Sequence, residues 1–152
     1  MGLDMYLSRK IYVGAYWDSR DVQGTVDIAA MGEKLPITLD KISYVEEHVA
    51  YWRKANAIHR WFVDEVGNSV DDCRPIWVNT EKLEELVQLC KRVKENHSLA
   101  PELLPAQEGF FFGSTEYDEW YFEDIDSTIE QLEETLNDPN HDMWSYVYEA
   151  SW

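Results

Sequence analysis

The stretch from Ser43 to Val66, SYVEEHVAYWRKANAIHRWFVDEV, contains neither proline nor glycine. Its apolar residues recur at the spacing of an α-helix, so at about 100° per residue one side is apolar and the other is charged. Gly67 and Asn68 follow as residues that end helices. The pattern therefore predicts one long central helix over Ser43–Val66. Side chains able to cap its first turn are Thr38, Asp40 and Ser43.

Three polar side chains lie on the apolar side of this predicted helix, namely His48, Asn56 and His59. They either form hydrogen bonds in the core or at a sheet edge, or they line a ligand pocket. If the Asp-Asp-Cys segment at 71–73 folds back beside such a pocket, its carboxylates and thiol would add groups suited to acid–base or metal chemistry. The chain has no HExxH, no CxxC and no histidines at i and i+4. We therefore favour the hydrogen-bonding roles and predict no catalytic residue, metal or cofactor.

Length and composition indicate one folded domain over residues 1–152. An aromatic content of 14% supports a packed core despite a net charge of -17. No stretch is long and apolar enough to span a membrane, and the N-terminus lacks the pattern of a signal peptide, so we expect a cytoplasmic protein. Cys73 and Cys90 fit no zinc spacing or disulfide framework, so both are expected to be free thiols. Cys73 is expected in a loop, and Cys90 on the buried side of a helix.

Alternation and turn signals predict the remaining strands. From Leu3 to Ser8 the residues Leu3, Met5 and Leu7 alternate with Asp4, Tyr6 and Ser8. From Met143 to Tyr148 the residues again alternate, and Trp144, Tyr146 and Tyr148 lie on one face. Further strands are predicted at Ile11–Val13, Thr25–Ala29, Pro36–Leu39 and Ile76–Val78, with a polar connection at Gly14–Gly24. The expected fold class is α+β, a single domain with a mostly antiparallel sheet, a long central helix and two further helices.

Two further helices and a hairpin are predicted in the second half of the chain. One helix begins at Asn79 or Thr80, and the other runs from Ile125 to Leu136 and stops before Pro139. Phe110 to Phe112 and Glu119 to Glu123 are expected to form a hairpin around a turn at Gly113–Tyr117. Asp124-Ile125-Asp126 is then interpreted as the cap of the last helix, although two acids could also help hold a cation.

The acidic residues are concentrated late in the chain. Residues 95–152 hold 15 of the 30 acids and none of the 13 Lys and Arg. A surface that serves only solubility usually mixes both signs, so the one-sided charge favours an acidic face for a basic partner. The residues predicted to bind that partner are Glu116, Asp118, Glu119, Glu123, Asp124, Asp126, Glu130, Glu133 and Glu134, with Asp138 at the end of the row.

Three motifs stand out along the chain: the opening MGLDMY at Met1–Tyr6, YWRKANAIHRWF at Tyr51–Phe62, and GFFFGSTEYDEWY at Gly109–Tyr121. Together they resemble a family of small bacteriophage and prophage proteins. The resemblance implies expression inside an infected bacterium, where small acidic phage proteins often act by binding a host enzyme, defence complexes included. It implies no catalytic residue.

We therefore expect a non-enzymatic protein that inhibits or modulates a basic, nucleic-acid-binding host protein. Carboxylates about 6 to 10 Å apart would imitate a phosphate backbone, as in an anti-CRISPR or anti-restriction protein that mimics DNA. Such a protein binds neither nucleic acid nor membranes itself. Two alternatives stay open: a small ligand-binding protein or enzyme that uses His48, Asn56 and His59, and a homo-oligomeric structural phage protein held by its aromatics.

Overall fold

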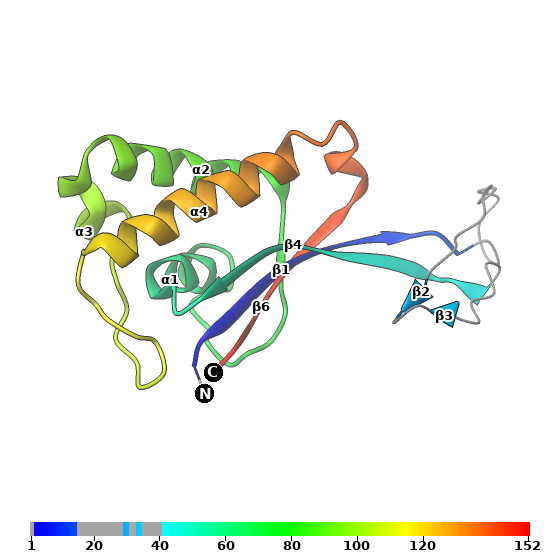
Figure 1. Ribbon diagram of the computed structural model, residues 1–152, viewed down its shortest axis with the longest axis horizontal. Coiled ribbons are helices and arrows are strands. Elements are labelled where there is room, and N and C mark those ends of the chain that lie inside the picture. Colours follow the sequence, from blue (N-terminus) through cyan, green and yellow to red (C-terminus); the bar gives the residue numbers. More distant parts are fainter. Residues whose placement is uncertain (1, 15–28, 31–32, 35–40) are drawn as a thin grey trace.

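An antiparallel sheet with the strand order β4-β1-β6-β5 lies at the centre of the computed structural model, which describes residues 2–14, 29–30, 33–34 and 41–152. Its strands are β1 (Asp4–Tyr12), β4 (Tyr44–Arg53), β5 (Ile76–Val78) and β6 (Ser145–Ser151). A separate pair is formed by β2 (Ala29–Ala30) and β3 (Glu33–Lys34). The helices pack on one face of the four-stranded sheet (Figure 1), so the α+β fold class is confirmed.

Strand β1 forms the middle of the sheet because its side chains alternate between core and surface. Met5 and Leu7 are fully buried, whereas Tyr6 between them is exposed. β1 pairs with β4 on one side and with β6 on the other. Beyond the pair Lys10–Ser145 only β1 and β4 continue, as a two-stranded ribbon (Figure 1). The predicted strand at the N-terminus is confirmed.

The prediction of one helix over Ser43–Val66 is wrong. Residues Tyr44–Arg53 form strand β4, and only Asn56–Glu65 form a helix, α1. The chain turns between them at Lys54, whose φ of 59° belongs to neither element.

Residues Tyr44–Arg53 form a strand rather than a helix because β1 pairs with both ends of this segment, and the register is interrupted once, at Val49. In this register Trp52 lies opposite Met5 and Ala50 lies opposite Leu7, so the buried residues recur at a spacing of two. Tyr44 and Val45, which a helix would have buried, are exposed on the ribbon. Ser43 therefore precedes a strand and caps no helix.

Several predicted features fall on parts of the chain that the structure does not describe. The caps Thr38 and Asp40 and the strand at Pro36–Leu39 lie outside the described residues. The connection at Gly14–Gly24 is described only at its first residue, and the strand at Thr25–Ala29 only at Ala29, where β2 begins.

Helices α2 (Thr80–Glu95) and α4 (Glu119–Leu136) lie side by side above α1 and the sheet (Figure 1). A short 3-10 turn at His97–Leu99 and α3 (Ala100–Leu103) follow α2, and a second 3-10 turn at His141–Met143 precedes β6. Asn79 caps α2 as predicted, because its side chain accepts a hydrogen bond of 2.9 Å from the Lys82 amide.

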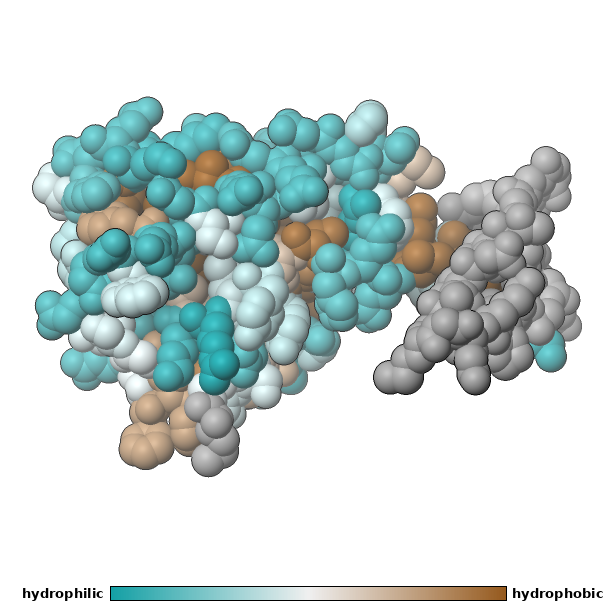
Figure 2. Space-filling model, in the orientation of Figure 1, coloured by the Kyte–Doolittle hydropathy of each residue, from teal (hydrophilic) through white to brown (hydrophobic). Residues whose placement is uncertain are grey.

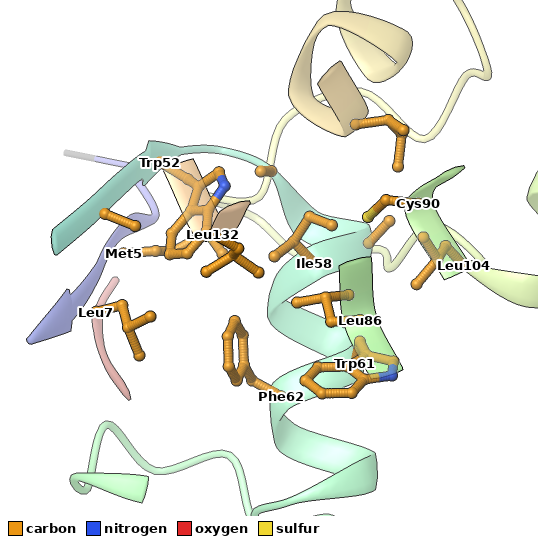
Figure 3. Close-up of a cluster of buried hydrophobic side chains, with 14 of the residues drawn as sticks. Met5, Leu7, Trp52, Ile58, Trp61, Phe62, Leu86, Cys90, Leu104 and Leu132 are labelled. Atoms are coloured by element: carbon orange, nitrogen blue, oxygen red, sulfur yellow. The ribbon is translucent and has the colours of Figure 1, made fainter. Parts of the chain in front are cut away.

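The core forms where the sheet, α1, α2 and α4 meet (Figure 3). Phe62 of α1 stacks on Tyr148 of β6, with ring centroids 4.0 Å apart, and the Trp52 ring packs against Phe62. Leu86 and Cys90 of α2 and Leu132 of α4 close the cluster from the other side. The predicted burial of Cys90 is confirmed, and Cys73 is exposed.

The hairpin predicted for residues 110–123 is also wrong. Phe110 is 94% exposed, and α4 already begins at Glu119. Asp118 caps this helix by accepting a hydrogen bond from the Tyr121 amide, and Tyr121 and Ile125 pack into the core. Asp124 consequently lies inside the helix, which corrects its interpretation as the cap.

Helix α4 also covers the free edge of the sheet. Strand β4 is an edge strand, so its outward backbone groups lack a partner strand. The Gln131 side chain accepts a hydrogen bond of 2.8 Å from the Tyr51 amide and donates one of 3.2 Å to the Tyr51 carbonyl. Trp52 Nε1 donates to Thr128 Oγ1 one turn earlier. These bonds fix the face of α4 that points outward. In the part of the chain that the structure describes, no helix combines the length and apolarity needed to cross a membrane.

Candidate functional site

His59 is a hydrogen-bonded core residue. Its ring is 1% exposed, Nδ1 lies 2.7 Å from the Tyr148 hydroxyl, and Nε2 lies 3.1 Å from Asp71 Oδ2. The Phe112 ring packs against the imidazole in a T-shaped arrangement, with ring centroids 5.2 Å apart. The cavity beside this network measures about 10 Å³, at the lower limit of the space that one water molecule needs. The network is therefore suited to holding α1, β6 and the 68–73 turn together.

Asn56 also has its hydrogen bonds satisfied within the fold. Its Nδ2 donates to the carbonyls of Phe112 and Ser114, at 2.9 and 2.8 Å, and its Oδ1 accepts from the Gln107 amide at 3.0 Å. One buried side chain at the start of α1 thus fixes both arms of the 105–116 loop.

The structure does not bring His48 together with these two residues. His48 is exposed on β4, where its Nδ1 lies 2.9 Å from Ser8 Oγ and its ring lies beside Tyr6, which points away from the helices. Among the described residues, no group of three or more His, Cys, Asp or Glu side chains is arranged to hold a metal ion. The geometry gives His48, Asn56 and His59 separate surroundings.

Apart from Asp138, which pairs with Arg9, the predicted acidic residues fall into three groups, of which the first is a row along the outside of α4 and the third shares Glu123 with it. Glu119, Glu123, Glu130 and Glu134 are exposed. They follow one another after four, seven and four residues, which corresponds to about 6, 10 and 6 Å along a helix. Within the described residues, none of the four forms an ion pair with a base. The surface over α2 and α4 is mostly hydrophilic (Figure 2).

The second group is neutralised by α2. Asp126 pairs with Lys94 at 2.9 Å, and Glu133 pairs with Lys91. Lys94 is the last basic residue of the chain and Lys91 lies three residues before it, so charge counts along the sequence did not show that both lie against α4. These two acids add less to an acidic surface than the row does.

The third group lines a cleft of about 360 Å³ between the start of α1 and the start of α4. Glu116, Asp118, Glu123 and Asp124 contribute carboxylates to its wall, and Trp120 contributes an indole that is 73% exposed. Burial, together with the charges of Glu123 and Asp118, raises the pKa of Asp124 from its ordinary value of 3.8 to about 7.

Two basic residues lie at the rim of this cleft. Arg53 is directed toward Asp4, with Nε and Oδ1 4.0 Å apart, and the Lys54 side chain packs over Gly113. Neither base forms an ion pair with a carboxylate of the cleft in the described structure. The cleft therefore combines an exposed indole with carboxylates that lack a basic partner.

Sequence reasoning missed Trp120 because it placed residues 119–123 in a strand, and it missed the role of Gln131 because it placed the edge strand Tyr44–Arg53 in a helix. A signal was present: Asp118 three residues before Tyr121 is the spacing of a helix cap. With the helix begun there, Trp120 lies between Glu119 and Glu123 on the side away from the core.

No protein-family model, curated protein or solved structure matches this chain. Fold and site together describe a small α+β protein whose last long helix carries a row of exposed carboxylates, with a carboxylate- and indole-lined cleft at one end.

Proposed function

We propose that the chain is a non-enzymatic binding protein of bacteriophage type that occupies the basic, nucleic-acid-binding surface of a host protein. The row Glu119, Glu123, Glu130 and Glu134 is the contact surface, and it takes the place of a phosphate backbone. A restriction or CRISPR effector is the kind of target that fits this chemistry.

One observation carries the proposal: the row stays exposed and without basic partners among the described residues, whereas Asp126 and Glu133 beside it are paired with lysines. Unpaired carboxylates repel one another on a helix, at a cost of a few tenths of a kcal/mol per pair. A basic partner would relieve this repulsion. The remaining acids after Lys94 strengthen the field that attracts such a partner.

This mode of binding has specific consequences. Association is driven by charge, so it is fast at low salt and weakens steeply as salt rises. Duplex DNA competes for the same basic surface of the partner. The protein itself binds no DNA, because its own field repels phosphates.

The test is capture of partners from bacterial lysate at about 50 and 500 mM salt, followed by titration of the purified partner in the presence and absence of duplex DNA. The variant Glu130→Lys/Glu134→Lys should abolish binding with an unchanged melting temperature. The control Glu84→Lys/Glu95→Lys makes the same change of net charge on exposed positions of α2 and should bind almost normally. A partner that is insensitive to salt, or that holds DNA and this protein together, would exclude mimicry.

A second candidate function is self-association, favoured by the uncovered face of the sheet. The exposed rings of Tyr6 and Tyr51 pack together there, with centroids 5.2 Å apart, and Trp77 is exposed on β5; exposed aromatics are typical of interfaces. Light scattering over a range of protein concentrations tests this candidate. A mass that stays monomeric at high protein and high salt would exclude it.

A further inference from the structure

The cleft between α1 and α4 has the composition of a receptor for one organic cation. Its volume of about 360 Å³ lies in the range of small-ligand sites. An indole face attracts a cation through its quadrupole, and carboxylates around it supply charge-assisted hydrogen bonds. Trp120 keeps its ring exposed in the cleft that Glu123 and Asp124 also line.

The protein already holds one guanidinium in the same way elsewhere. The Arg9 guanidinium lies 4.3 Å from the ring centroid of Trp144, and it donates to Asp138 Oδ2 at 2.8 Å and to Glu47 Oε2 at 2.7 Å. There an arginine of the chain itself satisfies the indole and the two carboxylates. In the α1–α4 cleft the indole and the carboxylates are present, and the nearby bases are directed to Asp4 and across Gly113.

We propose that this cleft binds the guanidinium of an arginine side chain presented by the protein partner, stacked on Trp120 and held by Asp124 and Glu123. The inference rests on the proposed function and names the anchoring contact of that interface. Arginine fits better than lysine because its planar group stacks on an aromatic ring and binds a carboxylate through two nitrogens.

The charge state of Asp124 makes this binding depend on pH. The charged and titratable groups around Asp124 in the cleft are Glu123, Asp118 and Tyr121 from α4 and its cap, Glu116 from the loop, Arg53 at the end of β4, and Lys54 after it. Because the pKa of Asp124 lies near 7, part of the population is protonated at neutral pH. A bound cation favours the carboxylate, so binding releases a proton and strengthens as pH rises from 6 to 8.

The probe is the capped peptide acetyl-Gly-Arg-Gly-amide, compared with the same peptides containing citrulline or lysine. Citrulline keeps the shape of arginine and removes the charge. Binding is followed by the NMR resonance of the Trp120 indole N–H at low salt. Only the arginine peptide should shift this resonance strongly. Trp120→Ala and Asp124→Asn should each weaken binding about tenfold, as measured by calorimetry, and Asp124→Asn should remove the pH dependence.

The matched control is Glu130→Gln/Glu134→Gln, which removes two charges outside the cleft and should change peptide affinity by only about twofold. Equal binding of the citrulline or lysine peptide, or full binding by Asp124→Asn, would overturn the inference.

Measurements with the intact partner separate the two proposals. If reversal at Glu130 and Glu134 abolishes the complex while both cleft variants bind normally, the acidic row is the interface and the arginine anchor is excluded. If only the cleft variants fail, the anchor stands and the acidic row is excluded.

Discussion

The Nδ1 atom of His59 and the hydroxyl of Tyr148 lie 2.7 Å apart in the core, and their hydrogen bond joins α1 to the β6 strand. The other ring nitrogen, Nε2, forms a hydrogen bond with Asp71 Oδ2. Trp152 Nε1 donates a hydrogen bond to the second oxygen of the same carboxylate, Oδ1. Three segments therefore meet around one imidazole, namely α1, the 68–73 turn, and the end of the chain from β6 to Trp152. Since the cavity beside it is about the size of a single water, this arrangement contributes to folding rather than to ligand binding.

Replacing His59 with alanine should lower the free energy of unfolding by roughly 1–3 kcal/mol, because the Tyr148 hydroxyl and Asp71 lose their partner. Urea denaturation measures this loss. His48→Ala is the control on the exposed side of the sheet and should cost less than about 1 kcal/mol. A His59→Ala protein that is as stable as the parent but has lost a bound metal or a turnover would contradict the structural role.

Replacing Asn56 with alanine should release the 105–116 loop while leaving the sheet intact. The side chain makes three hydrogen bonds, to the carbonyls of Phe112 and Ser114 and from the Gln107 amide. The expected loss of stability is about 1–3 kcal/mol. Hydrogen exchange should accelerate at Gln107, whereas amides of β1 keep their protection. Unchanged exchange at Gln107 would show that other contacts hold the loop.

The Asp124 carboxyl should make the free energy of unfolding fall as pH rises from 3.8 to about 7. Its folded pKa of about 7 exceeds its ordinary value of 3.8, so the folded state binds the proton more tightly. The contribution is fully present below the unfolded pKa and is lost as pH rises through the folded pKa.

Asp124→Asn stays neutral and should therefore exceed the parent in stability at pH 8, with the difference vanishing near pH 3.5. We expect about 1–2 kcal/mol, after allowing for solvent screening at this half-buried site. Urea denaturation of both proteins at both pH values measures the sign of the difference in their free energies of unfolding. A variant that is less stable than the parent at pH 8 would show that the carboxylate has a stabilising partner.

Thiol chemistry should distinguish the two cysteines. Cys73 is exposed and should react quickly with a thiol reagent in the folded protein. Burial raises the pKa of the Cys90 thiol to about 12, so Cys90 should react only after unfolding. Titration of one thiol before and two after denaturation would confirm this, and Cys73→Ala should abolish the fast reaction. Two rapid reactions in the native state would contradict the packing of α2.

Sequence alone determined the features that depend on local chemistry. The alternation of Leu3, Met5 and Leu7 was sufficient for β1, because only a strand places all three on one face. Asn79 predicts the start of α2, because a short polar side chain at that position accepts a hydrogen bond from a free amide of the first turn. The concentration of acids after Lys94 was likewise visible in the residues themselves.

Tertiary structure decided the features that depend on a partner distant in the chain. Residues Tyr44–Arg53 suit a helix by their spacing, and they became a strand because β1 pairs with them on both sides of one irregularity at Val49. In the same way, Lys91 and Lys94 decided which acids of α4 are neutralised, because ion pairing depends on the packing of α2 against α4. The exposed carboxylate row and the cleft at Trp120 exist only because that packing turns one particular face of α4 outward.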